Sequence, residues 1–262
     1  LDRLRREFVA NVSHELRTPL TSVKSHVETL ADGAVEDPAL ARQFLATVSR
    51  ETERMTRLVR DLLDLAALDQ KDALRACCPI SLGEAVKEAV ALIRPQAEKK
   101  GIVLEVNVNE NLPLVMADSD RVQQVVVNIL ANAVEFTPPA GRVTVSVSAR
   151  AGAVHVVIRD TGIGIPREDL PRVFERFYRV DKARSRELGG TGLGLSIARE
   201  IVIAHGGDIT INSRVGEGTE VDFWIPVCGG SHESPQRVQL GAPHGAPRHR
   251  AGARTSRGGA SR

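Results

Sequence analysis

The sequence predicts an α+β protein in which a helical hairpin is followed by a two-layer α/β sandwich. Two observations support this prediction. Residues 1–70 repeat apolar side chains at steps of three and four, whereas residues 79–228 alternate helical stretches with short strand-like ones. With 42% hydrophobic and 26% charged residues, the 262-residue chain has the composition of a globular protein. Residues 71–78 are predicted to be a linker and residues 229–262 a disordered tail.

The hairpin prediction rests on two apolar stripes. One helix is predicted over residues 1–31 and a second from Pro38, which suits a first helical turn. Two long helices with a short loop cannot bury both stripes efficiently, so we expect two copies to form a four-helix bundle. The stripes comprise Leu4, Phe8, Val12, Leu16, Leu20, Val23, Val27 and Leu30, then Leu40, Phe44, Val48, Met55, Leu58, Val59, Leu62 and Leu65.

The sandwich is predicted element by element. Helical patterns alternate with the period-two patterns of strands, which together make two layers. Ala151-Gly152 is the expected turn between two strands, and Gly206-Gly207 ends the last helix. We expect helices over residues 81–100, 118–136 and 193–205, and strands over residues 102–108, 142–151, 154–158, 208–213 and 219–227.

Composition excludes several classes of protein. No stretch approaches the about 18–20 uninterrupted apolar residues that cross a bilayer, and charged residues follow Leu1 where a signal peptide would be apolar. The chain as given is therefore expected to be soluble. Because it begins without Met inside a helical pattern, we also expect segments before residue 1. Cys77, Cys78 and Cys228 lack the spacing of a zinc site or a disulfide framework.

His14 is the first candidate for chemistry. At about 100° per residue it lies on the helix face opposite Val12 and Leu16, so we expect it to be exposed. Most helical histidines are packed in a core or idle on a surface. Here Glu15 can hold one imidazole nitrogen and leave the other as a nucleophile, and Thr18, one turn on, can reach the same space.

Two neighbours of His14 in the same helix carry separate expectations. Pro19 costs about 3 kcal/mol inside a helix, which predicts a local weakness beside His14. His26 has no acidic or hydroxyl side chain arranged as around His14, and we expect it to face solvent.

A polar stripe marks the helix predicted over residues 118–136. Gln124, Asn128, Asn132 and Glu135 step by four, four and three among apolar neighbours. Buried amides without partners are costly, so the stripe indicates an internal polar ligand rather than an ordinary wet face. Carboxamide oxygens suit Mg²⁺ and carboxamide NH₂ groups suit phosphate.

Two glycine motifs lie beyond that helix. Residues 160–164 follow an apolar strand, so that Asp160 can accept a hydrogen bond from an exocyclic amine while the glycines let backbone approach a flat ring. Residues 189–195 open a helix and offer free N–H groups to phosphate, without the lysine of a P-loop. Between them, residues 168–188 combine three aromatic residues with five arginines and are predicted to be a mobile lid.

Together these motifs resemble the sensor histidine kinases of bacterial two-component systems, over about residues 1–228. The resemblance implies a dimerisation and phosphotransfer hairpin and an ATP-binding domain of the Bergerat type. Within the family, the stretch from Phe8 to Asp69 is most similar to the phosphate-response sensor kinases. Five motifs occur in the family's order: the phospho-acceptor box at 13–19, the asparagine box at 128–132, and the first glycine, phenylalanine and second glycine boxes at 160–164, 174–178 and 190–194.

The resemblance implies a role for each matching residue. His14 would attack the γ-phosphate of ATP with Glu15 as its base, and Arg179 would stabilise the γ-phosphate charge. Thr18 would position water when phosphate is removed from the partner. Asn128 and Asn132 would hold Mg²⁺ and the phosphates, and Asp160 the adenine amine. The other implied ATP-binding residues are Gly162, Gly164, Ile165, Tyr178, Gly190, Thr191, Gly192, Leu193, Gly194, Leu195 and Thr219.

The resemblance also implies partners and location. It implies a homodimer that passes phosphate to an aspartate in the receiver domain of a response regulator. This partner is expected to dock on the hairpin just below His14, around Val23, Val27 and the second helix. The chain would be the cytoplasmic portion of a bacterial sensor that is anchored in the inner membrane through a segment before residue 1.

One position departs from the family pattern. A lysine that meets the phosphates usually follows the second asparagine by three residues, and here that residue is Glu135. We expect an anion there to reduce ATP affinity or to strengthen the dependence on Mg²⁺. The alternative function is a member biased toward phosphatase activity with a weak kinase.

Two other classes of protein share part of this pattern. A chaperone or topoisomerase relative would share the nucleotide-binding fold but not the hairpin with His14. A nucleic-acid-binding module is suggested by six arginines in residues 229–262, but this tail has no aromatic residue to stack on bases, so nucleic acid is not an expected partner.

Overall fold

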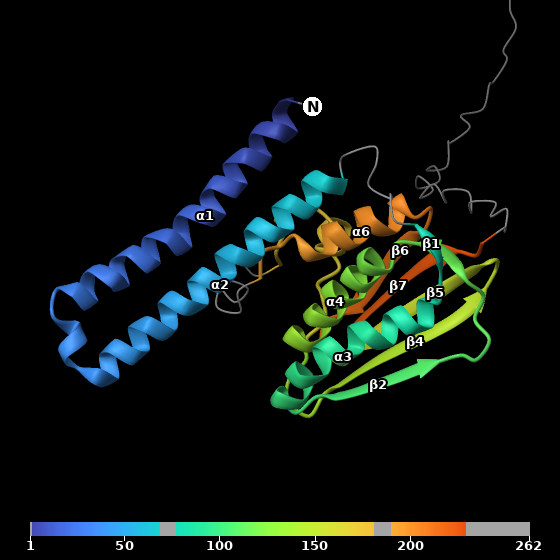
Figure 1. Cartoon of the computed structure of the whole chain (residues 1–262). Coiled ribbons are helices and arrows are strands. Elements are labelled where there is room, and N and C mark those ends of the chain that lie inside the picture. Colours follow the sequence, from blue (N-terminus) through green and yellow to red (C-terminus); the bar gives the residue numbers. More distant parts are fainter. Residues whose placement is uncertain (1, 69–76, 181–189, 229–262) are drawn as a thin grey trace, which may run out of the picture. The chain divides into compact units, whose positions relative to one another are not determined.

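The computed structural model describes residues 2–68, 77–180 and 190–228, with the side chains of residues 2–7 left out. Helix α1 (Asp2–Ala31) and helix α2 (Pro38–Leu68) form the predicted antiparallel hairpin, joined through the 3₁₀ turn η1 (Ala34–Glu36) (Figure 1). The predicted linker, apart from its last two residues, and the predicted tail lie outside the described residues. Within the described ranges, no helix has the length and apolarity to cross a membrane.

Local chemistry explains where the hairpin turns. Asp37 caps α2, because its Oδ1 accepts hydrogen bonds from the backbone N–H groups of Ala39 at 2.9 Å and Leu40 at 3.2 Å. Pro38 then begins the helix, as predicted. Pro19 is buried inside α1, and the helix runs on through it from Asp2 to Ala31.

The expectation that His26 faces solvent is wrong. Its ring is half-buried and meets Phe44 of α2 edge-on at 5.1 Å between ring centroids. His26 Nδ1 lies 2.7 Å from the carbonyl oxygen of Ser22. The apolar face of α2 therefore contacts a residue of α1 that lies outside the apolar stripe predicted for α1.

The second part is the predicted two-layer sandwich. A five-stranded sheet in the order β2-β4-β5-β7-β6 carries helices on one face (Figure 1). Only the β2–β4 pair is parallel among the described pairs of this sheet. The elements are α3 (Leu82–Lys100), β2 (Val103–Val108), α4 (Ser119–Phe136), β4 (Arg142–Arg150), β5 (Ala153–Asp160), α6 (Gly194–Ala204), β6 (Asp208–Arg214) and β7 (Gly218–Pro226).

Short elements complete this part. Strands β1 (Cys78–Ile80) and β3 (Val115–Ala117) pair antiparallel in a sheet of their own, and η2 (Leu170–Arg172) is a 3₁₀ turn. Neither strand is predicted from the sequence, because three residues are too few to establish an alternating pattern.

The core lies between the sheet and its helices. Alternate residues of β4 and β5 point into it, so that Val145 pairs in register with Ile158 and both are buried. Across the layer, Val126 and Leu130 of α4 are fully buried. Each such side chain contributes about 1.5–3 kcal/mol by leaving water.

Buried His205 fixes α6 against α4. Its Nε2 accepts a hydrogen bond from the backbone N–H of Asp118 at 3.0 Å, so Nδ1 carries the proton and donates to the carbonyl oxygen of Ile201 at 2.8 Å. Asp118 in turn caps α4 through its side chain. The first turn of α4 and the last turn of α6 are therefore held together, which sets how the two helices face each other.

Candidate active site

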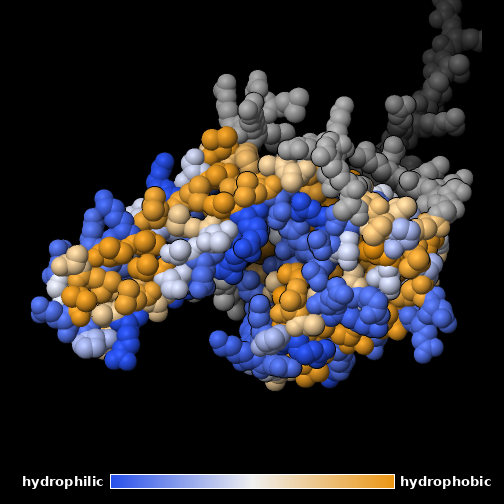
Figure 2. All heavy atoms as spheres, in the orientation of Figure 1, coloured by the Kyte–Doolittle hydropathy of each residue, from blue (hydrophilic) through white to orange (hydrophobic). Residues whose placement is uncertain are grey.

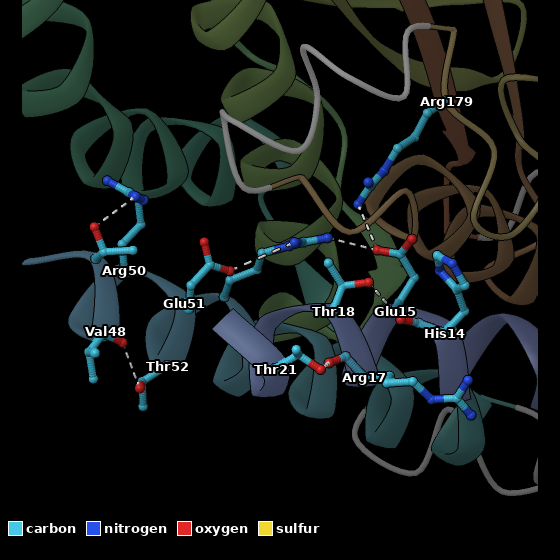
Figure 3. Close-up of polar contacts among 12 residues, drawn as sticks. His14, Glu15, Arg17, Thr18, Thr21, Val48, Arg50, Glu51, Thr52 and Arg179 are labelled. Atoms are coloured by element: carbon cyan, nitrogen blue, oxygen red, sulfur yellow. Dashed lines mark hydrogen bonds and ion pairs between the residues drawn. The ribbon is translucent and has the colours of Figure 1, made fainter. Parts of the chain in front are cut away.

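His14 lies exposed on α1, as the sequence predicts (Figure 3). Thr18 sits one turn later, and its Oγ1 donates a hydrogen bond to the carbonyl oxygen of His14 at 3.3 Å. The hydroxyl is thereby held against the helix backbone, one turn after His14. An exposed imidazole can reach a nucleotide or a partner without unfolding the hairpin.

Glu15 is half-buried and contacts two arginines. Its Oε2 lies 2.7 Å from Arg54 Nη2 and 3.4 Å from Arg179 Nη2 (Figure 3). Among the described residues, no hydrogen bond joins Glu15 to His14, so the predicted contact with the imidazole is not formed in this structure. The sequence did not predict a role for Arg54. An arginine within the apolar stripe of α2 is nevertheless a pattern from which one could be predicted.

Asp160 ends β5 as a buried carboxylate. Its Oδ1 accepts hydrogen bonds from the backbone N–H groups of Gly162 at 2.8 Å and Thr219 at 3.2 Å. Burial raises the pKa of Asp160, and the two backbone hydrogen bonds oppose that rise only in part. The two hydrogen bonds fix the carboxylate, which can accept a further hydrogen bond from an N–H group of a ligand.

The first glycine motif packs against the far edge of the sheet. Gly164 has φ of 72°, and a Cβ there would lie 2.0 Å from the carbonyl oxygen of Arg214. The next N–H, that of Ile165, donates to Ser213 Oγ at 2.8 Å, and this hydroxyl lies 2.9 Å from Thr219 Oγ1. Two predicted ATP-binding residues from distant parts of the chain, Ile165 and Thr219, thus both contact Ser213.

The asparagine stripe of α4 meets the second glycine motif. Asn128 Nδ2 donates to the carbonyl oxygen of Gly194 at 3.2 Å, and Asn132 follows one turn later, half-buried. Gln124 departs from the predicted stripe, because its Nε2 donates to Asp64 Oδ2 of α2 at 2.6 Å. The prediction that four polar side chains share one ligand therefore does not hold for Gln124.

Glu135 lies near three cations that belong to other elements. Burial raises the pKa of Glu135, while the charges of Arg57, Lys100 and Arg179 lower it. Lys100 Nζ donates to the carbonyl oxygens of Val134 at 2.8 Å and Glu135 at 2.6 Å, at the end of α4. The ammonium group of Lys100 thus lies near position 135, where the family usually has a lysine. Because Lys100 belongs to α3, no motif around Glu135 in the sequence predicts this contact.

The second glycine motif begins α6. Thr191 Oγ1 donates to Asp61 Oδ2 at 2.7 Å and accepts from the Leu193 N–H at 3.3 Å. The carbonyl oxygen of Gly192 accepts from the Phe177 N–H at 2.9 Å, which joins this motif to the phenylalanine box. Burial raises the pKa of Asp61. The remaining predicted residues of the motif are half-buried: Gly190, Gly194 and Leu195.

Tyr178 contacts charged groups at the beginning of the predicted lid. Its hydroxyl donates a hydrogen bond to Asp169, and the guanidinium of Arg172 lies 4.3 Å from the ring centroid. The hydrogen bond to Asp169 raises the pKa of Tyr178. The rest of the predicted lid, residues 181–188, lies outside the described residues.

Family comparisons agree with this arrangement. Residues 4–71 match the His Kinase A (phospho-acceptor) domain, and residues 117–228 match the histidine kinase-, DNA gyrase B-, and HSP90-like ATPase family. A solved structure of a mycobacterial sensor histidine kinase, MprB, is 30% identical, with a TM-score of 0.51 over 58% of this chain and 98% of that one. The chain belongs to the bacterial sensor histidine kinases.

Longer sensor kinases match more of the chain. Sensor histidine kinase WalK of Bacillus subtilis is 46% identical over 237 residues, 86% of this chain and 37% of the relative. Sensor protein kinase WalK of Staphylococcus aureus is 42% identical over 228 residues, 86% of this chain and 54% of that relative. The chain therefore spans little more than a third of the Bacillus kinase. Because these relatives are WalK proteins, the finer resemblance to phosphate-response kinases is not confirmed.

Two solved sensor kinases hold a ligand or a partner. ThkA in complex with the response regulator TrrA has a TM-score of 0.71 at 26% identity, over 86% of this chain and 63% of that one. ShkA in complex with AMPPNP has a TM-score of 0.61 at 30% identity, over 84% of this chain and 46% of that one. The predicted fold, a phospho-acceptor hairpin before an ATPase-type sandwich, is that of this histidine kinase family.

Proposed function

We propose that this chain phosphorylates His14 from ATP and passes the phosphoryl group to an aspartate of a response regulator. The observation that carries the proposal is an exposed histidine beside a carboxylate, in a chain that also holds Asp160 and the glycine and asparagine motifs of a nucleotide pocket. The ion pair of Glu15 with Arg179 supports it, since that arginine comes from the phenylalanine-box segment.

The proposed reaction uses the two imidazole nitrogens differently. His14 Nε2 forms a bond to the γ-phosphorus while the bond from that phosphorus to the ADP oxygen breaks, and ADP leaves with the electron pair. Glu15 accepts the proton of Nδ1, which would otherwise remain on a cationic ring. Arg179 balances the charge that develops on the phosphoryl oxygens.

Asp160 and the glycine motifs are proposed to bind the nucleotide. Asp160 accepts the adenine amine, and the backbone around the pocket encloses the ring and phosphates. Asn128 and Asn132 fit a magnesium ion, because Asn128 uses its NH₂ on Gly194 and so leaves its amide oxygen for a hard cation. Bound Mg²⁺ would neutralise phosphate charge. The other proposed pocket residues are Gly162, Gly164, Ile165, Tyr178, Gly190, Thr191, Gly192, Leu193, Gly194, Leu195 and Thr219.

We further propose a homodimer built on residues 1–70, a linker over 71–78 and an ATP-binding domain over 79–228. The response regulator would dock below His14 around Val23 and Val27. ThkA, which matches 86% of this chain, was solved with a response regulator, which supports this class of partner. Since the WalK relatives are longer sensor proteins, we propose that the chain is the cytoplasmic part of a sensor anchored in the inner membrane.

The test of the proposed kinase is incubation with γ-labelled ATP and Mg²⁺. We expect acid-labile, alkali-stable label on the wild-type chain and none on His14→Ala. Label that survives in His14→Ala, or wild-type chain that binds ATP without acquiring label, would contradict the proposal.

A second candidate function is a phosphatase-biased kinase. Two observations favour it: an exposed Thr18 hydroxyl lies one turn after His14, where we propose that it positions water, and Glu135 places an anion where the family has lysine. We expect Glu135→Lys to tighten ATP binding or weaken its Mg²⁺ dependence, and to raise the labelling rate relative to dephosphorylation of a phosphorylated regulator. If neither binding nor the ratio of rates changes, Glu135 does not set the balance.

A further inference from the structure

Arg54 occupies a position where the hairpin otherwise buries apolar side chains. The buried residues of α2 are Ala41, Arg54, Leu58 and Leu65, and Arg54 precedes Leu58 by one turn on the same face. Only 8% of the Arg54 side chain is exposed. A cation at this depth requires partners, since an isolated buried charge is very costly.

The partners of Arg54 are two carboxylates of the hairpin. Its Nη2 lies 2.7 Å from Glu15 Oε2 on α1, and its Nη1 lies 3.9 Å from Glu51 Oε2, one turn earlier on α2. Glu15 and Glu51 are themselves mostly buried, although they come from different helices. Arg54 is therefore fixed from its own helix while it fixes Glu15 on the other.

This ion pair is poorly explained by stability alone. Buried ion pairs contribute little net stability, because the loss of hydration offsets their attraction, and apolar residues of similar size are often as stable. The stripe of α2 already supplies such residues at Leu58 and Leu65. A group that must be held in one orientation gives a better reason for an arginine at this position.

We propose that Arg54 is a positioning residue for Glu15 in the phosphorylation of His14, an inference that rests on the proposed function. Among the described residues, both ion pairs of Glu15 use Oε2, which leaves Oε1 to accept the Nδ1 proton of His14. Arg54 and Arg179 both hold the carboxylate by Oε2, which restricts the rotation of the Glu15 side chain. Within the described part of the chain Glu15 forms no hydrogen bond to His14, and a carboxylate restricted in this way has fewer orientations to lose when it turns Oε1 toward the Nδ1 proton.

The test is a double-mutant cycle on the initial rate of His14 labelling at saturating ATP. The chains are wild type, Arg54→Ala, Glu15→Gln and the double variant, with Arg54→Lys to restore the charge and Arg54→Met to restore the packing. Arg50→Ala is the matched control, because Arg50 is an exposed arginine one turn earlier on the same helix. ATP affinity, dimer mass and thermal midpoint are measured for every chain.

We expect Arg54→Ala to lower the labelling rate about tenfold or more, within the about 10²–10⁴-fold that a general base contributes. ATP affinity should remain unchanged. Arg54→Lys should recover part of the rate and Arg54→Met none, although Met fills the space. In the Glu15→Gln background, loss of Arg54 should change the rate less than about twofold, since the group it positions is gone.

Three results would overturn the inference. One is a wild-type rate in Arg54→Ala. Another is an equal loss in both backgrounds, which would mean that Arg54 does not act through Glu15. The third is full recovery in Arg54→Met, which would assign Arg54 to packing. A wild-type chain without label would overturn the proposed function and this inference together.

Discussion

Among single residues, Asp160 lowers the stability of the folded chain at neutral pH. Its carboxylate is buried at the end of β5, and burial raises its pKa. Between the ordinary pKa of an aspartate, about 3.9, and the raised value, the folded chain binds more protons than the unfolded chain. The free energy of unfolding therefore falls as the pH rises through that interval, and it stays lower above it.

Asp160→Asn should consequently stabilise the nucleotide-free protein at neutral pH. The amide oxygen can keep both backbone hydrogen bonds, while its NH₂ group opposes the adenine amine, so ATP affinity should be lost. Urea unfolding at a series of pH values measures the difference in the free energy of unfolding between Asp160→Asn and wild type. This difference should shrink as the pH falls through the raised pKa of Asp160. A variant less stable than wild type at pH 7 would refute this account of the carboxylate.

Gly164 has less room for a side chain than the other glycine of the first motif, Gly162. Gly164→Ala places a Cβ 2.0 Å from a carbonyl oxygen of β6, in addition to the strain of φ at 72°. Gly152→Ala is the matched control, because its φ is 77° but nothing lies within 4 Å of the added carbon. We expect Gly164→Ala to cost at least about 1–3 kcal/mol more than Gly152→Ala. Equal costs in denaturant unfolding would show that the close approach is unimportant.

At the scale of elements, the joint between α6 and α4 connects stability to the site. His205 accepts the Asp118 N–H at the beginning of α4, and Asn128 of α4 binds Gly194 at the beginning of α6. We expect His205→Ala to leave a buried N–H without its acceptor, which lowers the free energy of unfolding by about 1–3 kcal/mol. ATP affinity should fall as well, because the asparagine motif of α4 and the glycine motif of α6 are no longer held in position relative to each other. Unchanged unfolding would show that water replaces the imidazole.

The elements also show what the sequence could predict. Long periodic helices such as α2 and α4, and alternating strands such as β4, were predicted to within a few residues, because burial of one face dictates their pattern. The three-residue strands β1 and β3 carry no such pattern, so only their tertiary pairing identifies them.

Within the site, local motifs predicted where some residues lie but not which distant side chains they contact. The exposure of His14 and the position of Asp160 at a strand end follow from spacing alone. The cations around Glu15 and Glu135, and the carboxylate of Asp64 that Gln124 contacts, come from distant parts of the chain, so the local sequence does not predict these contacts.

At the scale of the whole molecule, the hairpin exposes the apolar side chains that a second copy could cover. Leu63 of α2 is 67% exposed, and Figure 2 shows apolar residues gathered on the visible side of the hairpin. The exposed large apolar residues of the two helices are Val9, Leu20, Val27, Leu45, Val59 and Leu63.

We expect the double variant Leu20→Glu, Leu63→Glu to convert the proposed dimer into monomers and to reduce labelling of His14. Leu92→Glu is the control, because Leu92 lies in α3 of the sandwich and is 58% exposed. Analytical ultracentrifugation measures the outcome. A wild-type chain that sediments as a monomer, or a double variant that remains dimeric, would contradict the proposed four-helix bundle.

The decisive question is whether the phosphoryl group of ATP is transferred to the His14 side chain. Fragmentation mass spectrometry at neutral pH, after incubation with ATP and Mg²⁺, answers it, because this method identifies the modified residue. We expect one phosphoryl group, on His14, and none in Asp160→Asn, which lacks the proposed adenine contact. A phosphoryl group on another residue, or none on a chain shown to bind ATP, would contradict it.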